Sequence, residues 1–215
     1  MSVYLEVTNP VVPNLKKLEF AYTPQIEYSA DVKYDMYSTT HTNYQLNGFT
    51  RSENPTIGLT CKFSAHTAEH FKMSEFAIRF LRTYTKMNYG RTDENRGQPP
   101  RILRFFAHGN SMFNNVPIVL TKFSMTFPED VDYVKGSIGN DGALTKTDVV
   151  RSTQVPSNVL ADKQVTANSV SGEIYLPILF SISISMLMQQ NMYNAVKEFN
   201  LKDFANGKLS SKGYI

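Results

Sequence analysis

The longest regular pattern in the chain is an alternation of apolar and other side chains over residues 173–188. One side of this segment carries Ile174, Leu176, Ile178, Phe180, Ile182, Ile184, Met186 and Met188. A period of two places alternate residues on opposite faces of a β-strand. Fully extended, the strand would reach roughly 50 Å, about three times the usual strand length. We therefore expect a bend or break near Pro177, and a sheet with more length than one small core covers.

The same alternation predicts further strands. Residues 26–36 alternate throughout, and residues 44–49 form the expected return strand of a hairpin. Residues 57–65, 101–107 and 112–127 follow as strands. The apolar side of the first of these three is Ile57, Leu59, Cys61, Phe63 and Ala65, and one side of the last carries Val119, Phe123, Met125 and Phe127. The chain is therefore expected to be mainly β.

Between these strands the hydrophobic period changes to that of a helix. Apolar residues recur at spacings of three and four: Met73, Phe76, Ala77, Phe80, Leu81, Tyr84 and Met87. Thr67 is a suitable N-cap, and Gly90 is the expected C-terminal stop. The opposite side carries Arg79, Arg82 and Lys86. We interpret it as a solvated face or an inter-subunit salt-bridge surface in preference to a phosphate-binding one.

The remaining segments are less regular. Residues 1–23 predict an irregular lead-in with a strand at 18–22. Residues 128–171 are rich in Gly, Ser, Thr and Asp and predict a long loop or insertion, which in a compact domain is often functional. A short helix is expected around 192–199, within a C-terminal helix and tail at 190–215. We expect residues 1–215 to form a single domain.

Composition narrows the class of protein. Hydrophobic residues make up 41% and charged residues 19% of the chain, as in a folded globular protein. A net charge of +3 is too small to indicate nucleic-acid binding by itself. The single cysteine, Cys61, excludes an intramolecular disulfide and is expected to be a buried small hydrophobe. Without a secretory pattern in the first ten residues or an apolar run of about 20, we expect a cytoplasm-like compartment and no membrane insertion.

One short motif suggests enzymatic chemistry. The segment His66-Thr67-Ala68-Glu69-His70 matches the inverted zinc-peptidase pattern, in which two histidines bind zinc and the glutamate activates water. That mechanism needs both histidines on one helical face, but the helix is expected to begin at Thr67, which leaves His66 outside it. The alternative is a pair of polar residues at a strand-to-helix junction, with Glu69 near the helix N-terminus. We favour this alternative and assign no metal, cofactor or catalytic residue.

Other catalytic patterns are missing from the sequence. It contains no phosphate-binding loop, no dinucleotide-binding glycine fingerprint and no G-x-S-x-G elbow. The serines Ser181, Ser183 and Ser185 share one strand face, and we interpret them as small packing residues or a hydrated surface.

Several stretches resemble the tail-tube-fold proteins of contractile-tailed bacteriophages, in particular the tube-initiator or baseplate-hub members. The similar stretches are YDMYSTTHTNYQLNGF (34–49), NPTIGLTCKF (54–63), FLRTYTKMNYG (80–90), QPPRILRFF (98–106) and MFNNVPIVLTKFSMTFPEDVDYV (112–134), together with the last strand. They lie within residues 25–190, and their order and spacing carry the resemblance. The stretch 136–171 departs from it by its greater length.

This resemblance implies a mainly β fold with one central helix, in which two packed antiparallel sheets form a barrel-like sandwich. It further implies a structural, non-enzymatic protein of the virion tail, assembled in the host cytoplasm as a homohexameric ring. Adjacent tail-tube and baseplate or hub proteins would be its partners, and the tape-measure protein and DNA would pass through the channel. We expect the hairpin at 25–50 and the segment 128–171 to make contacts between subunits or layers.

Other functions stay open from the sequence. A tube of a phage-derived injection or secretion machine would share all of these features. A zinc-dependent hydrolase using His66, Glu69 and His70 would hold stoichiometric metal. A nucleic-acid-binding β-barrel would bind DNA tightly and in a salt-dependent manner.

Overall fold

A computed structural model of the chain describes residues 2–91, 95–138, 144–150 and 172–215. Its centre is an antiparallel seven-stranded sheet with the strand order β2-β1-β7-β8-β12-β6-β3. The strands are β1 (Tyr4–Val7), β2 (Lys17–Glu19), β3 (Gln25–Ser29), β6 (Thr56–Ser64), β7 (Leu103–Ala107), β8 (Phe113–Thr126) and β12 (Leu179–Met188). The interior strand β12 pairs with β6 on one side and with β8 on the other.

The alternation seen in the sequence places one face of this sheet in the core. On β6, the predicted apolar set from Ile57 to Ala65 is buried, which confirms that prediction. Its register with β12 stacks the rings of Phe63 and Phe180, whose centroids lie 5.5 Å apart. Cys61 faces Ile182 in the next inward pair. The strands therefore interlock through one continuous apolar layer.

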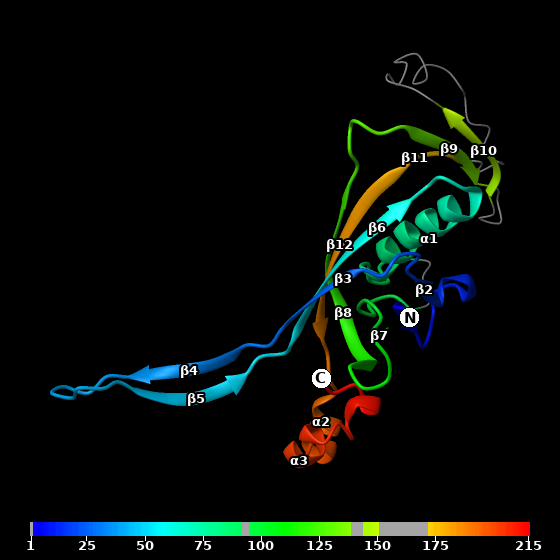
Figure 1. Cartoon of the computed structure of the whole chain (residues 1–215). Helices are drawn as coiled ribbons and strands as arrows, with labels where there is room; N and C mark the ends of the chain where they lie inside the picture. The colour runs from blue at the N-terminus through cyan, green and yellow to red at the C-terminus, as the bar shows by residue number, and fades with distance from the viewer. Residues whose placement is uncertain (1, 92–94, 139–143, 151–171) are drawn as a thin grey trace.

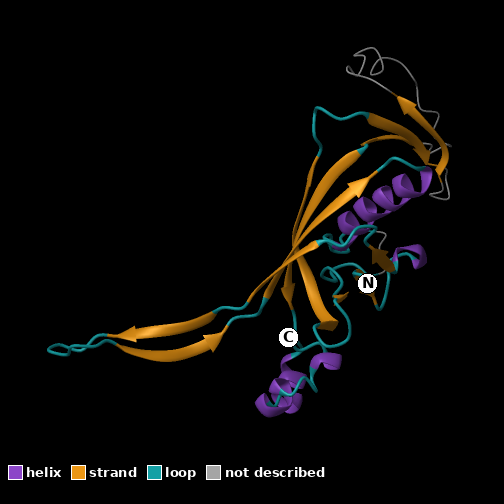
Figure 2. Cartoon of the chain, viewed as in Figure 1, coloured by secondary structure: helices purple, strands orange, loops and turns teal. Residues whose placement is uncertain are grey.

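Helix α1 (Ala68–Tyr84) covers the core face of the sheet (Figure 2). Thr67 caps it as predicted, because its Oγ1 accepts a hydrogen bond from the backbone N–H of His70 at 3.2 Å. The buried stripe is Phe71, Ala77, Ile78, Phe80, Leu81 and Tyr84. The Tyr84 hydroxyl donates to the Leu15 carbonyl at 2.7 Å, which ties the helix to the 3₁₀ turn η1 (Pro13–Leu15).

The predicted end of this helix was wrong. The helix stops at Tyr84, and the backbone N–H of the C-cap residue Thr85 donates to the Leu81 carbonyl at 3.2 Å. Gly90 lies beyond it. Met73 and Met87, which the spacing placed on the apolar stripe, are exposed.

The predicted barrel-like closure is also wrong. The described strands form antiparallel sheets in a β-rich α+β fold, but the main sheet stays open, with β2 and β3 at its two edges. Helix α1 occupies the core face on which a second packed sheet was expected. Residues outside the main sheet and α1, such as Leu15, Val134 and Leu176, also belong to the buried cluster, so the face is covered without barrel closure.

The segment predicted as a long loop at 128–171 contains strands. Strands β9 (Tyr133–Ile138), β10 (Leu144–Val150) and β11 (Gly172–Pro177) form a three-stranded sheet in the order β10-β9-β11. Glycine and polar residues hide the period in this segment, so the alternation was not recognised. Residues 139–143 and 151–171 of the prediction lie outside the described residues.

The break expected near Pro177 is confirmed. Strand β11 ends at Pro177 and β12 begins at Leu179, with Ile178 between them. The backbone N–H of Ile178 donates to the backbone carbonyl of Asp132 at 2.9 Å, and the Ile178 carbonyl accepts from the backbone N–H of Ala65 at 2.8 Å. One residue therefore joins the three-stranded sheet to the main sheet.

A second irregularity lies in β8. Ser185 pairs with Lys122 and Met186 with Leu120, so Thr121 is an extra residue whose hydroxyl donates to the Ser185 carbonyl at 2.9 Å. Phe123 therefore faces the core, whereas Val119, predicted on the same side, faces the other way. A period of two cannot reveal such a bulge.

The predicted hairpin exists but leaves the body of the molecule. The alternating segment 26–36 splits into β3, in the main sheet, and β4 (Val32–Tyr37). Strand β4 pairs only with β5 (Leu46–Ser52), and the two extend outward as an arm (Figure 1). We call residues 31–53 the arm.

The short helix predicted around 192–199 is confirmed, but a further helix that was not expected follows it. The C-terminal segment contains two short α-helices, α2 (Met192–Glu198) and α3 (Leu201–Ala205), followed by the 3₁₀ turn η3 (Ser210–Lys212). The side chains of Asn191 and Asn200 cap the two helices. We call residues 191–215 the C-terminal module. In the lead-in, β1 and β2 replace the single strand predicted at 18–22.

The contact between α1 and the sheet predicts the effect of a core truncation. Phe80 is 0% exposed and lies edge-on to Tyr84, with 4.6 Å between the ring centroids. Replacing Phe80 with Ala should lower the free energy of unfolding by about 3–5 kcal/mol, because a buried ring is lost and a cavity remains. Urea unfolding followed by circular dichroism measures this. The exposed control Lys72→Ala should change it by less than about 0.5 kcal/mol, and equal effects of the two variants would contradict the packing described.

Candidate interaction surfaces

The face of the main sheet that points away from α1 is polar and exposed. Cross-strand register brings together Ser181, Ser183 and Ser185 of β12 with neighbours on β6 and β8. Its polar members are Gln25, Glu27, Thr56, Thr60, Lys62, Lys122, Ser124, Thr126, Ser181, Ser183 and Ser185. Leu179 and Leu187, at the two ends of β12, and Val119 opposite Leu187 lie on the same face. We call it the polar sheet face. The sequence placed the three serines on one face, and the structure confirms this.

Short hydroxyl side chains dominate this face. Ser183 lies between Thr60 and Ser124, so three adjacent strands present hydroxyl groups side by side. Such groups donate and accept hydrogen bonds with water at any position. The charged members, Lys62, Lys122 and Glu27, are few and of both signs. This face is therefore a hydrated wall without the concentrated basic patch that holds a phosphate backbone.

The arm carries large apolar side chains that nothing in the described chain covers. Its exposed members are Val32, Tyr34, Met36, Tyr37, Tyr44, Leu46 and Phe49, and the exposed fraction reaches 71% at Met36 and 86% at Tyr44. A monomer rarely shows a contiguous apolar patch above a few hundred Å² unless the patch is functional. The arm is therefore a candidate interface.

The base and faces of the arm are ordered by specific contacts. A backbone hydrogen bond from Glu53 to the Asp31 carbonyl, 2.8 Å long, ties the two legs where they leave the sheet. On one face, the rings of Tyr34 and Phe49 meet edge to face at 6.0 Å. An isolated two-stranded hairpin is only marginally stable in water, so an arm of this kind gains stability from a partner.

A hollow of about 690 Å³ lies between α1 and β11. It is lined by the basic residues of the helix face noted in the sequence, Arg79, Arg82 and Lys86, and by Phe127 and Tyr175. Glu75 lies at its edge, 3.6 Å from the guanidinium of Arg79. Burial raises the pKa of the Glu75 carboxyl, and the positive charge of Arg79 opposes that shift.

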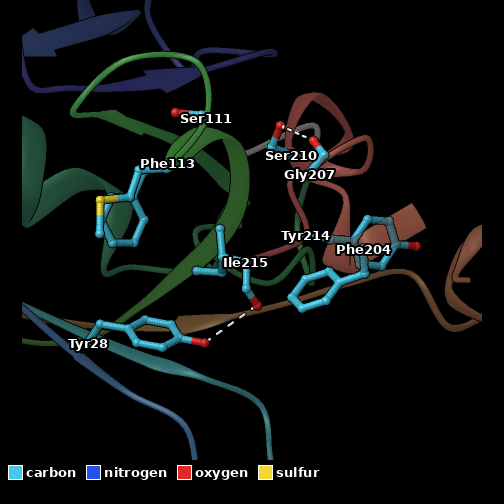
Figure 3. A pocket seen from close by; sticks show the side chains of 9 residues that line it. Tyr28, Ser111, Phe113, Phe204, Gly207, Ser210, Tyr214 and Ile215 are labelled. Carbon is cyan, nitrogen blue, oxygen red and sulfur yellow. Dashed lines mark hydrogen bonds between the residues drawn. The ribbon is translucent and has the colours of Figure 1, made fainter. Parts of the chain in front are cut away.

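A smaller apolar cavity of about 290 Å³ lies where the C-terminal module meets the main sheet (Figure 3). Its walls include Tyr28 and Phe113 from the sheet side, and Phe204, Tyr214 and Ile215 from the module. The rings of Tyr28 and Phe113 lie 6.3 Å apart, and the Tyr28 hydroxyl donates to an Ile215 oxygen at 3.5 Å. Burial raises the pKa of the Tyr28 hydroxyl. We call this the module cavity.

Tight backbone packing holds the module against the sheet beside this cavity. Gly213 has a positive φ of 81°, and a β-carbon on it would lie 2.4 Å from the Asn115 carbonyl oxygen, closer than any side chain allows. The side-chain amide of Gln190 donates to the Gly213 carbonyl at 3.0 Å. Only glycine therefore permits this approach of module to strand β8.

The residues of the zinc-peptidase motif do not form a metal site among the described residues. His66 precedes the first turn of α1, as the sequence indicated, and Glu69 lies exposed in that turn. His70 turns toward the strand instead, with its Nδ1 3.3 Å from the hydroxyl of Ser64. That hydroxyl also lies 3.1 Å from the Tyr22 hydroxyl, so His70 belongs to a polar junction between sheet and helix.

The single cysteine is buried as predicted. Cys61 is 1% exposed, and burial raises the pKa of its thiol to about 12. The thiolate that would act as a nucleophile is therefore scarce at neutral pH.

Comparison with known proteins adds no family. A scan against protein-family models finds no match to the chain, and a search of curated proteins finds no relative. Among the described residues, no helix combines the length and the apolar character needed to cross a membrane.

The module cavity and the exposed apolar residues of the C-terminal module were missed from the sequence. Met192 and Val196 are four residues apart and 82% and 79% exposed. A short helix was expected around 192–199, but the expectation of a helix does not tell which of its sides faces the protein. The cavity depends on segments far apart in the chain, Tyr28 and Phe204 among them, and no local signal joins these.

The buried carboxyl of Glu75 predicts a pH-dependent gain of stability in the variant Glu75→Gln. Its folded-state pKa is raised above the unfolded value of about 4.3. The wild-type protein therefore loses stability as pH rises through the interval between these two pKa values, whereas the glutamine variant does not. Urea unfolding at about pH 4 and pH 7 should show the variant gaining relative to wild type at the higher pH. The exposed control Glu129→Gln should not show this, and a pH-independent difference for Glu75→Gln would contradict the assignment.

Proposed function

We propose that this protein is a structural subunit of a contractile phage tail, which forms a homohexameric ring of the tail tube or of its junction with the baseplate. The polar sheet face lines the channel of this ring, and the arm contacts neighbouring subunits. The resemblance of residues 25–190 to tail-tube proteins suggests this function, and the unpartnered surfaces of the chain support it.

The observation that carries the proposal is the polar sheet face. A sheet that buries one face under α1 and exposes hydroxyl groups on the other needs no further cover from its own chain. DNA passing through a channel requires a wall that stays hydrated and does not hold phosphates tightly. Serines and threonines with few charges of mixed sign meet this requirement, because they provide no dense row of cations.

The arm supports assembly by a second route. Its apolar side chains lie on an extension that has left the core of its own subunit, so their burial requires another chain. A contact between an arm and a different surface of the next subunit is heterologous, and such contacts close into rings when the rotation between subunits allows it. Adjacent tail-tube and baseplate proteins are the other partners that this function requires.

Electron microscopy and sedimentation velocity of the purified chain, and of tails that contain it, test this proposal. We expect six-fold rings or short tubes. The double variant Tyr34→Ser/Phe49→Ser should lose these assemblies while keeping its circular dichroism spectrum, because both side chains are exposed on the arm.

The matched control is Lys33→Ala, a polar change on the same strand. It should leave assembly close to wild type. A compact monomer at high concentration that also fails to enter tails would overturn the proposed function.

A further inference from the structure

Two surfaces of the chain are apolar, unpartnered and different in shape. The arm is a projection, and the module cavity is a recess, and they lie on separate parts of the molecule (Figure 1). The tip of the arm is the most exposed part of the projection, with Tyr44 in the turn and Tyr37 and Leu46 as the cross-strand pair beside it.

We propose that the module cavity of one subunit receives the arm tip of a second copy of this chain, with the ring of Tyr44 as the inserted group. This inference rests on the proposed function, because it names the subunit contact that the ring uses.

The volume of the cavity fits an aromatic ring. A cavity of roughly 150 Å³ holds benzene in a well-studied engineered protein. The module cavity offers about 290 Å³, enough for the phenol ring of Tyr44 and part of a neighbouring side chain. Four of its nine lining residues are aromatic, so an inserted ring would make the edge and offset contacts that aromatic side chains favour.

The arm cannot fill the cavity of its own subunit. The backbone hydrogen bond between Glu53 and Asp31 holds its legs together at the base, and the arm points away from the C-terminal module. From residue 31 to the turn at residue 42 the extended chain reaches roughly 35 Å. A projection of this length can reach beyond its own subunit, so a second copy is the occupant that we infer.

The distribution of charge is compatible with this pairing. The acidic residues of the arm outnumber its basic ones, Asp31, Asp35 and Glu53 against Lys33 and Arg51. The C-terminal module has the opposite balance, with Lys197, Lys202, Lys208 and Lys212 against Glu198 and Asp203. Both acidic residues form ion pairs within the module, Asp203 with Lys208 and Glu198 with Lys212, at 3.2 Å each. The charged residues of the arm lie toward its base, where Arg51 pairs with Glu53 at 3.4 Å. The tip, residues 36–46, has no Asp, Glu, Lys or Arg, so its insertion brings no formal charge into an apolar cavity.

Cysteine cross-linking of the full-length chain tests the contact. Cys61 is buried with a raised thiol pKa, so introduced cysteines can be read against an unreactive background. We would mix the variants Tyr44→Cys and Ser111→Cys, since Ser111 is exposed at the rim of the module cavity, and oxidise them mildly. The mixture should give several times more covalent dimer than either variant alone. A chain carrying both changes should give a ladder of higher oligomers.

The control pairs Tyr44→Cys with Lys72→Cys on the exposed side of α1, and it should give only background dimer. Independently, Tyr44→Ala should weaken association about ten-fold or more, as at an interface hot spot, whereas Tyr44→Phe should keep it.

The outcomes separate this inference from the proposed function. Rings without a Tyr44–Ser111 cross-link would overturn the arm-to-cavity contact and leave the tail function standing. A monomer without cross-link at the highest soluble concentration overturns the contact as well. A cross-link in assemblies other than six-fold rings would support the contact and count against the tail ring.

Discussion

The whole molecule depends on burying one face of one sheet under one helix. Strands β6, β12 and β8 supply alternate apolar side chains, and α1 covers them with a stripe that includes Phe71 and Phe80. Because side chains alternate along a strand, except at the bulge in β8, the residues that fill this core leave their neighbours on the opposite face. The residues between the core positions therefore form the polar sheet face. A mutation that shifted the register of a strand by one residue would move its core side chains to the polar face and its polar side chains to the core.

The surplus apolar surface is found where the chain leaves this core. The arm begins where the alternation of residues 26–36 passes beyond the edge of the sheet, and the C-terminal module begins where β12 ends. Both carry apolar residues that the helix cannot reach, such as Met36 and Val196. A buried body with exposed apolar extensions is the arrangement that the proposed assembly requires, because the extensions would be covered on association.

The sequence predicts well those features that repeat locally. The faces of β6 and β12, the Thr67 cap and the break beside Pro177 all follow from periods and caps visible in the chain. It fails where the outcome depends on distant contacts. The bulge at Thr121 shifts Val119 without changing the pattern, β9 and β10 contain glycine and polar residues that mask their alternation, and sheet closure depends on what covers the core face. Exposure of the arm's apolar residues was equally invisible, because an alternating strand has the same pattern in a core and on a projection.

Ile178 also gives the molecule a mechanical property. It connects β11 to β12 along the chain, and its backbone forms hydrogen bonds with Asp132 and Ala65, which lie on two other segments. A pull on the three-stranded sheet along β11 is therefore transmitted straight into β12, an interior strand of the main sheet. There it loads the hydrogen bonds to β6 and β8 in shear, all together, instead of peeling them apart one at a time. Tension applied at that end of the subunit is shared by the whole sheet, so the body resists it as a rigid unit.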